Sequence, residues 1–154
     1  MINLQESFAL PPTVSFDVFD TLTLPQFDKE NQIWKPSWLP NHKILAELFR
    51  FASTGWNIYL ITDVENTPKN KRELEWFLIQ NQLQDVVNGR IIYCTGLESK
   101  AKILKGLPNL KFHYDDDPFE LEALPDGVTG IKIYHPTDEA VKKRIKESHE
   151  QSSA

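Results

Sequence analysis

The chain alternates short apolar runs with amphipathic segments, and this alternation predicts strands and helices in turn. The apolar runs are rich in β-branched and aromatic side chains, as expected for buried strands. They cover residues 14–19, 56–61, 90–94, 110–114 and 130–134. The intervening segments carry apolar side chains at helical spacing and begin at capping residues. Helices are predicted after the caps Asn41, Thr67 and Asp117, and further helices begin at Lys100 and Thr137.

Strand and helix alternate five times with short connections. Because crossovers between parallel strands are right-handed, this order predicts one parallel sheet with helices on both faces. We therefore expect an α/β fold with a three-layer, Rossmann-like arrangement around a five-stranded parallel sheet. A length of 154 residues suits a single domain over residues 1–154, with its core at about 13–147 and a frayed tail at about 148–154.

One segment, at about residues 23–40, interrupts the alternation and is predicted to be a flap-like loop. It contains three prolines, and its middle, residues 27–34, can form a small hairpin folded over the end of the first strand. Trp34 and Trp38 lie in this segment. They can stack on a flat substrate group or pin the loop to the domain surface, and the second interpretation is favoured.

Composition narrows the class of protein. Apolar residues make up 40% and charged residues 25% of the chain, which is typical of a folded globular protein. The net charge of −5 argues against stable binding of duplex DNA. Cys94 is the single cysteine, so a reducing compartment is the simpler assumption, and the chain has no apolar run of membrane-spanning length. We expect a cytoplasmic protein that does not bind a membrane, and its oligomeric state stays open.

Polar side chains close consecutive strands of the predicted sheet. They are Asp17, Asp20 and Thr21 after the first, Thr62 and Asp63 after the second, Lys100 after the third, and Asp115 and Asp116 after the fourth. Because carboxyl ends of parallel strands share one edge, these groups are expected to converge. Such a set suits phosphoryl transfer with a cation held by Asp17 and one of Asp115 and Asp116. Oxygen ligands favour Mg²⁺ over zinc, while Thr62 and Lys100 can stabilise the phosphoryl charge.

The segment Phe16-Asp17-Val18-Phe19-Asp20-Thr21-Leu22 resembles the first motif of the haloacid dehalogenase-like hydrolases, which runs Asp-x-Asp-x-Thr-Leu after an apolar strand. The resemblance implies that Asp17 is an aspartyl nucleophile, and that Thr21 and Thr62 are the hydroxyl residues of the first two motifs. It assigns the motif-three lysine to Lys100, with Lys102 as an alternate. Asp115 and Asp116 match the acidic fourth motif, in which the second residue is the expected stronger metal ligand.

The first motif departs from the family at Phe19, which stands where family phosphatases carry the aspartate that protonates the leaving group. Phe19 can offer only its backbone carbonyl to the metal. Asp20 can serve from a shifted position, although adjacent residues of an extended segment point to opposite faces. Since general acid–base assistance is worth about 10² to 10⁴ in rate, slow turnover is expected.

The resemblance implies a haloacid dehalogenase-like domain without a large cap domain, which is typical of phosphatases of bulky substrates. The first hypothesis is an Mg²⁺-dependent phosphohydrolase that hydrolyses a phosphomonoester, such as a nucleotide or nucleic-acid end, through an aspartyl-phosphate. Thr21, Asp20, Asp63 and Trp34 are its candidate substrate-binding residues. The alternative is a phosphate- or metal-binding module that lost efficient turnover with Phe19. A regulatory or structural domain without ligand chemistry is the third.

Overall fold

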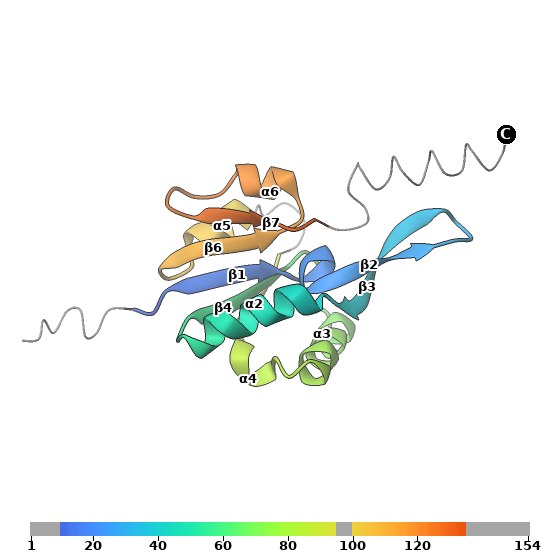
Figure 1. Cartoon of the computed structure of the whole chain (residues 1–154), viewed down its shortest axis with the longest axis horizontal. Helices are drawn as coiled ribbons and strands as arrows, with labels where there is room; N and C mark the ends of the chain where they lie inside the picture. The colour runs from blue at the N-terminus through green and yellow to red at the C-terminus, as the bar shows by residue number, and fades with distance from the viewer. Residues whose placement is uncertain (1–9, 95–99, 135–154) are drawn as a thin grey trace, which may run out of the picture.

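The computed structural model describes residues 10–94 and 100–134 and has a parallel sheet at its centre (Figure 1). The sheet consists of β1 (Thr13–Asp17), β4 (Asn57–Thr62), β5 (Ile91–Tyr93), β6 (Leu110–Asp115) and β7 (Thr129–Lys132). Its order is β5-β4-β1-β6-β7, and every neighbouring pair is parallel. The prediction of an α/β fold with a five-stranded parallel sheet is therefore confirmed.

Helices cover both faces of this sheet. The helices α2 (His42–Ser53), α3 (Pro68–Gln80) and α4 (Gln84–Val87) share one apolar core with alternate residues of the strands, such as Phe16 and Leu60. The helix α5 (Lys100–Lys105) packs on the other face through Leu104, beside Ile61. On that face α6 (Pro118–Glu122) lies over β7, where a Cβ at Gly130 would come within 2.8 Å of the Leu121 side chain. The short helix α4 was not predicted.

The central strand β1 is buried along its whole length. Val14 and Phe16 join the apolar core under α2 and α3, and because successive strand side chains alternate, Thr13, Ser15 and Asp17 face the opposite side. The parallel register aligns Ser15 with His113 and Phe16 with Tyr114 of β6. This register brings the carboxyl ends of β1 and β6 together, so Asp17 and Asp115 lie side by side.

The first strand ends at Asp17, two residues earlier than predicted. A tight turn, η1 (Val18–Leu22), follows, in which Asp20 adopts a left-handed conformation with φ of 62°. The turn closes through a hydrogen bond from Thr23 N to the Val18 carbonyl. Asn41 Nδ2 donates to the Thr21 carbonyl and ties the start of α2 to this turn. Asp20 tolerates the left-handed conformation better than a β-branched residue does.

The flap-like segment is a long antiparallel hairpin of β2 (Thr23–Asp28) and β3 (Ile33–Pro40). The predicted hairpin at residues 27–34 was right in place but too short. Prolines are tolerated because both strands of a two-stranded sheet are edge strands, and the register shifts between Leu24 and Gln26, around Pro25. The tip of the hairpin projects from the domain (Figure 1). At its base, Trp38 packs against Phe19 at 4.6 Å and Phe77 at 5.5 Å between ring centroids.

The predicted caps of α3 and α6 are present: Thr67 accepts a hydrogen bond from Asn70 N, and Asp117 accepts one from Phe119 N. Predicted features at Thr137 and in the tail at 148–154 lie outside the described residues. None of the helices in the described part of the chain has the length and apolarity that crossing a membrane requires.

Candidate functional site

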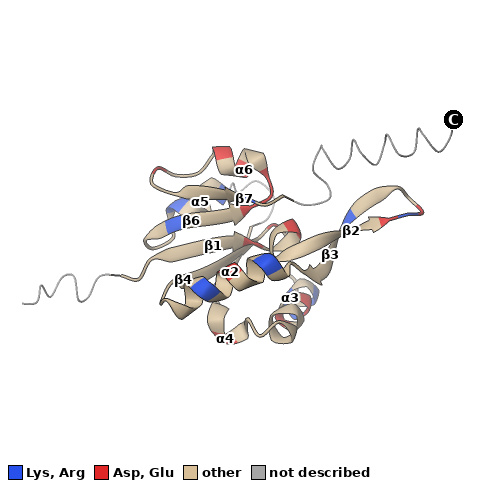
Figure 2. Ribbon diagram, viewed as in Figure 1, with Lys and Arg blue, Asp and Glu red and all other residues tan. Residues whose placement is uncertain are grey.

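A pocket of about 670 Å³ opens at the carboxyl ends of β1 and β6. It lies where the chain order reverses around β1, with β4 on one side and β6 on the other, and such switch points are where ligands bind in open α/β sheets. Its charged lining consists of Asp17, Asp63, Asp115, Asp116, Asp117 and Lys100. Figure 2 shows acidic residues in red at the ends of β1 and β6. The pocket is therefore strongly acidic, and among its described lining residues Lys100 carries the positive charge.

Asp17, the last residue of β1, is buried, with 6% of its surface exposed. Lys100 Nζ donates to Asp17 Oδ1 at 2.9 Å, and Thr21 Oγ1 donates to Oδ2 at 3.3 Å. The η1 turn makes the second contact possible because it folds Thr21 back toward the strand end. Burial, followed by the charge of Asp115, raises the pKa of Asp17 well above its ordinary value, and Lys100 only partly opposes this. In the absence of a cation, Asp17 is thus a destabilised carboxylate.

Lys100 bridges the two strands from the first turn of α5. Its ammonium group donates to Asp17 Oδ1 at 2.9 Å and to Asp115 Oδ2 at 3.0 Å, and the side chain is buried. Burial lowers the pKa of Lys100, but the two carboxylates outweigh it and raise the pKa above its usual range. The lysine is therefore a fixed positive charge. Lys100 contacts Asp17, as its assignment as the motif-three lysine requires, whereas Lys102 is exposed. The catalytic role of Lys100 stays a prediction.

Asp115 is fully buried and accepts three hydrogen bonds. Lys100 Nζ and His113 Nε2 both contact Oδ2, at 3.0 and 2.9 Å, and the Asp117 backbone N–H donates to Oδ1 at 3.0 Å. Burial raises the pKa of Asp115, but the His113 hydrogen bond, the Lys100 charge and the Asp117 N–H outweigh burial and lower it to about 2. Asp115 and Asp17 share one lysine, yet their pKa values shift in opposite directions because Asp115 has more donors.

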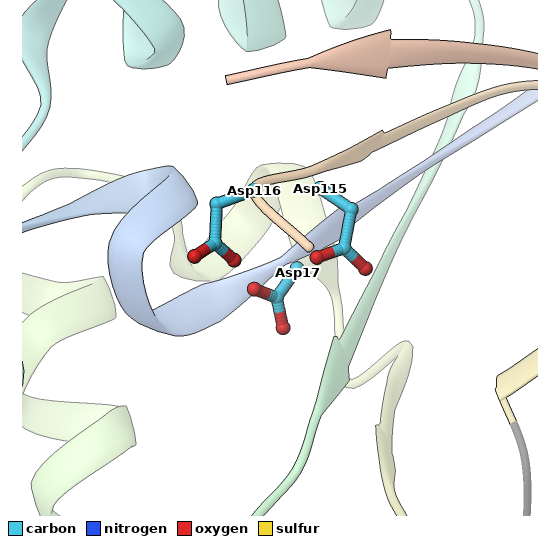
Figure 3. A group of neighbouring side chains, drawn as sticks. All are labelled: Asp17, Asp115 and Asp116. Carbon is cyan, nitrogen blue, oxygen red and sulfur yellow. The ribbon is translucent and has the colours of Figure 1, made fainter. Parts of the chain in front are cut away.

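Three carboxylates form a group that can hold a metal ion. Asp17, Asp115 and Asp116 each offer one oxygen, and these oxygens lie within 4.8 Å of one another. Figure 3 shows the three side chains gathered at the ends of the two strands. Oxygen ligands of this kind suit a hard divalent cation. The donor set therefore fits the predicted metal site, while the identity of the ion and the greater strength of Asp116 stay predictions.

Two further predicted residues line the pocket. Asp63, exposed at its wall, follows β4, and Phe19 lies at the turn after β1. The Phe19 ring packs against Trp38, so this aromatic residue holds the base of the hairpin against the domain. The favoured interpretation of Trp38 as a residue that pins the flap is thus confirmed. Metal binding by the Phe19 carbonyl stays a prediction.

Four predicted residues are not among the pocket's described lining. Thr62 ends β4 at the same edge, but its side chain is buried. Thr21 is buried too, and the structure shows its contact with Asp17. Asp20 lies in the left-handed position of η1, where its backbone N–H donates to Thr23 Oγ1. Trp34 packs against Phe27 across the hairpin, with ring centroids 5.1 Å apart. Direct contacts of these residues with a substrate stay predictions.

Sequence reasoning gave no role to Ser15 or His113, which connect to the site through Asp115. The signal was the period-two pattern: Ser15 precedes Asp17 by two residues, and His113 precedes Asp115 by two. Residues two apart on a strand share a face. A polar residue two positions before a candidate ligand on a buried strand was therefore the signal from which a hydrogen-bond partner of that ligand could have been predicted.

A scan against protein-family models finds no match to the chain, and a search of curated proteins finds none either.

Proposed function

We propose that this chain is an Mg²⁺-dependent phosphohydrolase of the haloacid dehalogenase-like type, acting on phosphomonoesters through an aspartyl-phosphate at Asp17. The observation that carries the proposal is the buried contact of Lys100 with Asp17 at 2.9 Å, beside carboxylates of Asp115 and Asp116 within 4.8 Å. These residues come from three separate segments that the resemblance had named in advance. Their meeting at the switch point of a parallel sheet supports an active site over chance.

The metal site explains an otherwise unfavourable cluster. Asp17 is buried, and its nearest carboxylate neighbours raise its pKa, so the ionised nucleophile is disfavoured without a cation. A bound Mg²⁺ would neutralise charge between the carboxylates and the phosphoryl oxygens. Asp17, Asp115 and Asp116 would hold it, with the Phe19 carbonyl as a further ligand. Lys100 keeps Asp17 oriented throughout, because it is anchored on Asp115 as well.

In the first step, an oxygen of the Asp17 carboxylate forms a bond to phosphorus, and the bond from phosphorus to the leaving oxygen breaks. The leaving oxygen takes a proton from water, since Phe19 offers none. A second water then attacks the phosphorus and gives up a proton to the hydroxide left by the first step. The bond between the Asp17 oxygen and phosphorus breaks, and inorganic phosphate leaves with Asp17 regenerated as a carboxylate. Lys100 stabilises the negative charge that develops near Asp17 in both steps.

The substrate we infer is a bulky phosphomonoester, such as a nucleotide or a nucleic-acid end. The pocket is open, and Pro36 of the hairpin forms part of its wall. Because Trp38 anchors the base of the hairpin on Phe19 and Phe77, the hairpin is a fixed wall beside the entrance. A fixed wall of this kind leaves room for a large leaving group outside the pocket.

The alternative is a phosphate- or metal-binding module with weak or no turnover. The observation that favours it is the Phe19 side chain, which packs on Trp38 and presents no proton donor to the pocket. Phe19→Asp separates the two functions. If the missing acid limits turnover, this variant is expected to raise the rate by about tenfold or more. Phe19→Leu is the control, since it keeps an apolar side chain against Trp38 without supplying an acid.

The deciding experiment is phosphate release from para-nitrophenyl phosphate by the purified chain, with Mg²⁺ and with EDTA. The proposal expects release that requires Mg²⁺, that Asp17→Asn abolishes, and that Asp85→Asn on the exposed surface of α4 leaves unchanged. Absence of release together with an Mg²⁺-dependent rise in melting temperature supports the binding module. Absence of both responses rejects both functions and leaves a structural or regulatory domain.

A further inference from the structure

A chain of buried polar side chains leads from the interior of the sheet to the pocket. Ser15 Oγ lies 2.7 Å from His113 Nδ1, and His113 Nε2 lies 2.9 Å from Asp115 Oδ2. Each of these three residues has 0% of its surface exposed. Buried polar groups are unfavourable unless they are hydrogen-bonded, whereas an apolar pair at Ser15 and His113 would fill the same space without that requirement. Their presence in the core points to a task beyond packing.

The sheet register places this pair directly beneath the site. Ser15 and His113 are partners across β1 and β6, and Asp17 and Asp115 follow two residues later on the same faces. Lys100 Nζ then joins Asp115 to Asp17. An unbroken series of hydrogen bonds therefore runs from Ser15 through His113, Asp115 and Lys100 to the proposed nucleophile.

The chemistry of these groups sets the direction of the hydrogen bonds. Asp115 as a carboxylate only accepts, so the proton shared with it belongs to His113 Nε2. In a ring that carries its single proton on Nε2, Nδ1 is the acceptor, and the Ser15 hydroxyl donates to it. Ser15 thereby holds the imidazole in one tautomer and one orientation, as partners of this kind do around metal sites.

We infer that Ser15 and His113 are positioning residues for the metal site, which hold the Asp115 carboxylate in the orientation that binding the cation requires. This inference rests on the proposed function. His113 and Lys100 hold Oδ2 while the Asp117 N–H holds Oδ1, so the carboxylate cannot rotate. An oxygen of Asp115 is thereby kept within 4.8 Å of oxygens of Asp17 and Asp116. Without His113, Oδ2 keeps only Lys100, which it shares with Asp17, as its described side-chain donor.

Three variants separate positioning from packing. His113→Phe fills the site but removes the donor, and by analogy with other outer partners of metal ligands it is expected to raise the half-saturating Mg²⁺ concentration about tenfold or more. His113→Gln keeps an N–H donor and is expected to restore binding to within about threefold of the wild type. Ser15→Ala leaves the ring but frees its tautomer, and a rise of about threefold is expected.

The measurement is calorimetric titration of the purified 154-residue chain with Mg²⁺, which does not depend on turnover. Val14→Ala is the matched control. Val14 precedes Ser15 on β1, but its side chain lies on the other face of the sheet, in the apolar core under α2 and α3. It is expected to lower the melting temperature without changing Mg²⁺ affinity. At saturating Mg²⁺, His113→Gln and Ser15→Ala are expected to recover most of the wild-type turnover number, because the lost function is metal binding.

The inference is overturned if wild type binds Mg²⁺ and the variants bind it equally well, or if Val14→Ala weakens binding as much as they do. Should His113→Phe fail to fold, Ser15→Ala and His113→Gln decide by the same titration. If the wild type binds Mg²⁺ and releases phosphate, and Ser15→Ala binds Mg²⁺ with unchanged affinity, the positioning role is overturned but the proposed function is not. A wild-type chain that neither binds Mg²⁺ nor releases phosphate overturns the proposed function, and the positioning role with it.

Discussion

Asp17→Asn is expected to stabilise the metal-free protein even though it removes the proposed nucleophile. Asp17 lies within 4.8 Å of oxygens from both Asp115 and Asp116, and 2.9 Å from Lys100 Nζ. At an effective dielectric constant of about 20, each carboxylate repels Asp17 by about 3.5 kcal/mol, and the lysine attracts it by about 6 kcal/mol. The two repulsions outweigh the attraction by about 1 kcal/mol. Burial of the charge adds to this penalty, in agreement with the raised pKa of Asp17.

The variant removes the charge but keeps the shape and an oxygen that can accept from Lys100. We therefore expect its free energy of unfolding to exceed that of the wild type by about 1–2 kcal/mol in EDTA, a rise in melting temperature of about 2 to 8 °C. The assay is thermal melting at neutral pH with EDTA and then with Mg²⁺. With Mg²⁺ the wild type is expected to melt at the higher temperature, because the ion stabilises the wild type, whereas the variant lacks one of its ligands.

The pH dependence gives an independent check on the same reasoning. A carboxyl group with a raised pKa in the folded protein destabilises the fold at high pH, and this penalty declines as the pH falls through the folded pKa. The advantage of Asp17→Asn in EDTA is therefore expected to shrink on acidification and to vanish near the unfolded pKa of 3.8. If the Asp17→Asn variant melts below the wild type in EDTA, with an unchanged circular dichroism spectrum, the electrostatic account is refuted. Asp85→Asn, on the exposed surface in the first turn of α4, is the control, and any change in its melting temperature should be the same in EDTA and in Mg²⁺.

Three further outcomes follow from the same contacts. Lys100→Met leaves Asp17 and Asp115 buried without their shared cation, so urea unfolding in EDTA should show a loss of about 3 kcal/mol or more, and equal stability would contradict the bridging role. Trp38→Ala removes the contacts with Phe19 and Phe77. The free energy of unfolding is expected to fall by about 2 kcal/mol, and proteolysis within residues 23–40 is expected to become faster. Trp34→Ala is the control and should change the rate of proteolysis less. The lowered pKa of Asp115, about 2 against 3.8, stabilises the fold by about 2 kcal/mol above pH 3.8, and this is lost as the pH falls through about 2. In EDTA, Asp115→Asn should therefore lose less stability between pH 3.8 and about 2 than the wild type does. An equal loss in the variant would mean that other groups cause the acid destabilisation.

The aromatic base of the hairpin shows why one residue was interpreted incompletely from the sequence. From the sequence, Phe19 was interpreted only as the replacement of the general-acid aspartate. The structure adds that its ring packs on Trp38. This contact joins residues that are far apart along a proline-containing segment, and no local periodicity connects them. The length of the hairpin was underestimated for the same reason: pairing between β2 and β3 depends on cross-strand partners and on a register shift around Pro25.

Apart from α4 and the full length of the hairpin, the sequence by itself determined the helices and strands of the described domain and the edge of the sheet at which polar groups gather. Strand periodicity, helix caps and the polar closure of each strand are local properties. It also placed Asp17, Lys100 and Asp115 in one group, since parallel strands share a carboxyl edge. Tertiary structure alone decided the order of the strands and the register that pairs Ser15 with His113. Register depends on side-chain packing between distant segments, and it settled which buried polar residue lies beneath which carboxylate.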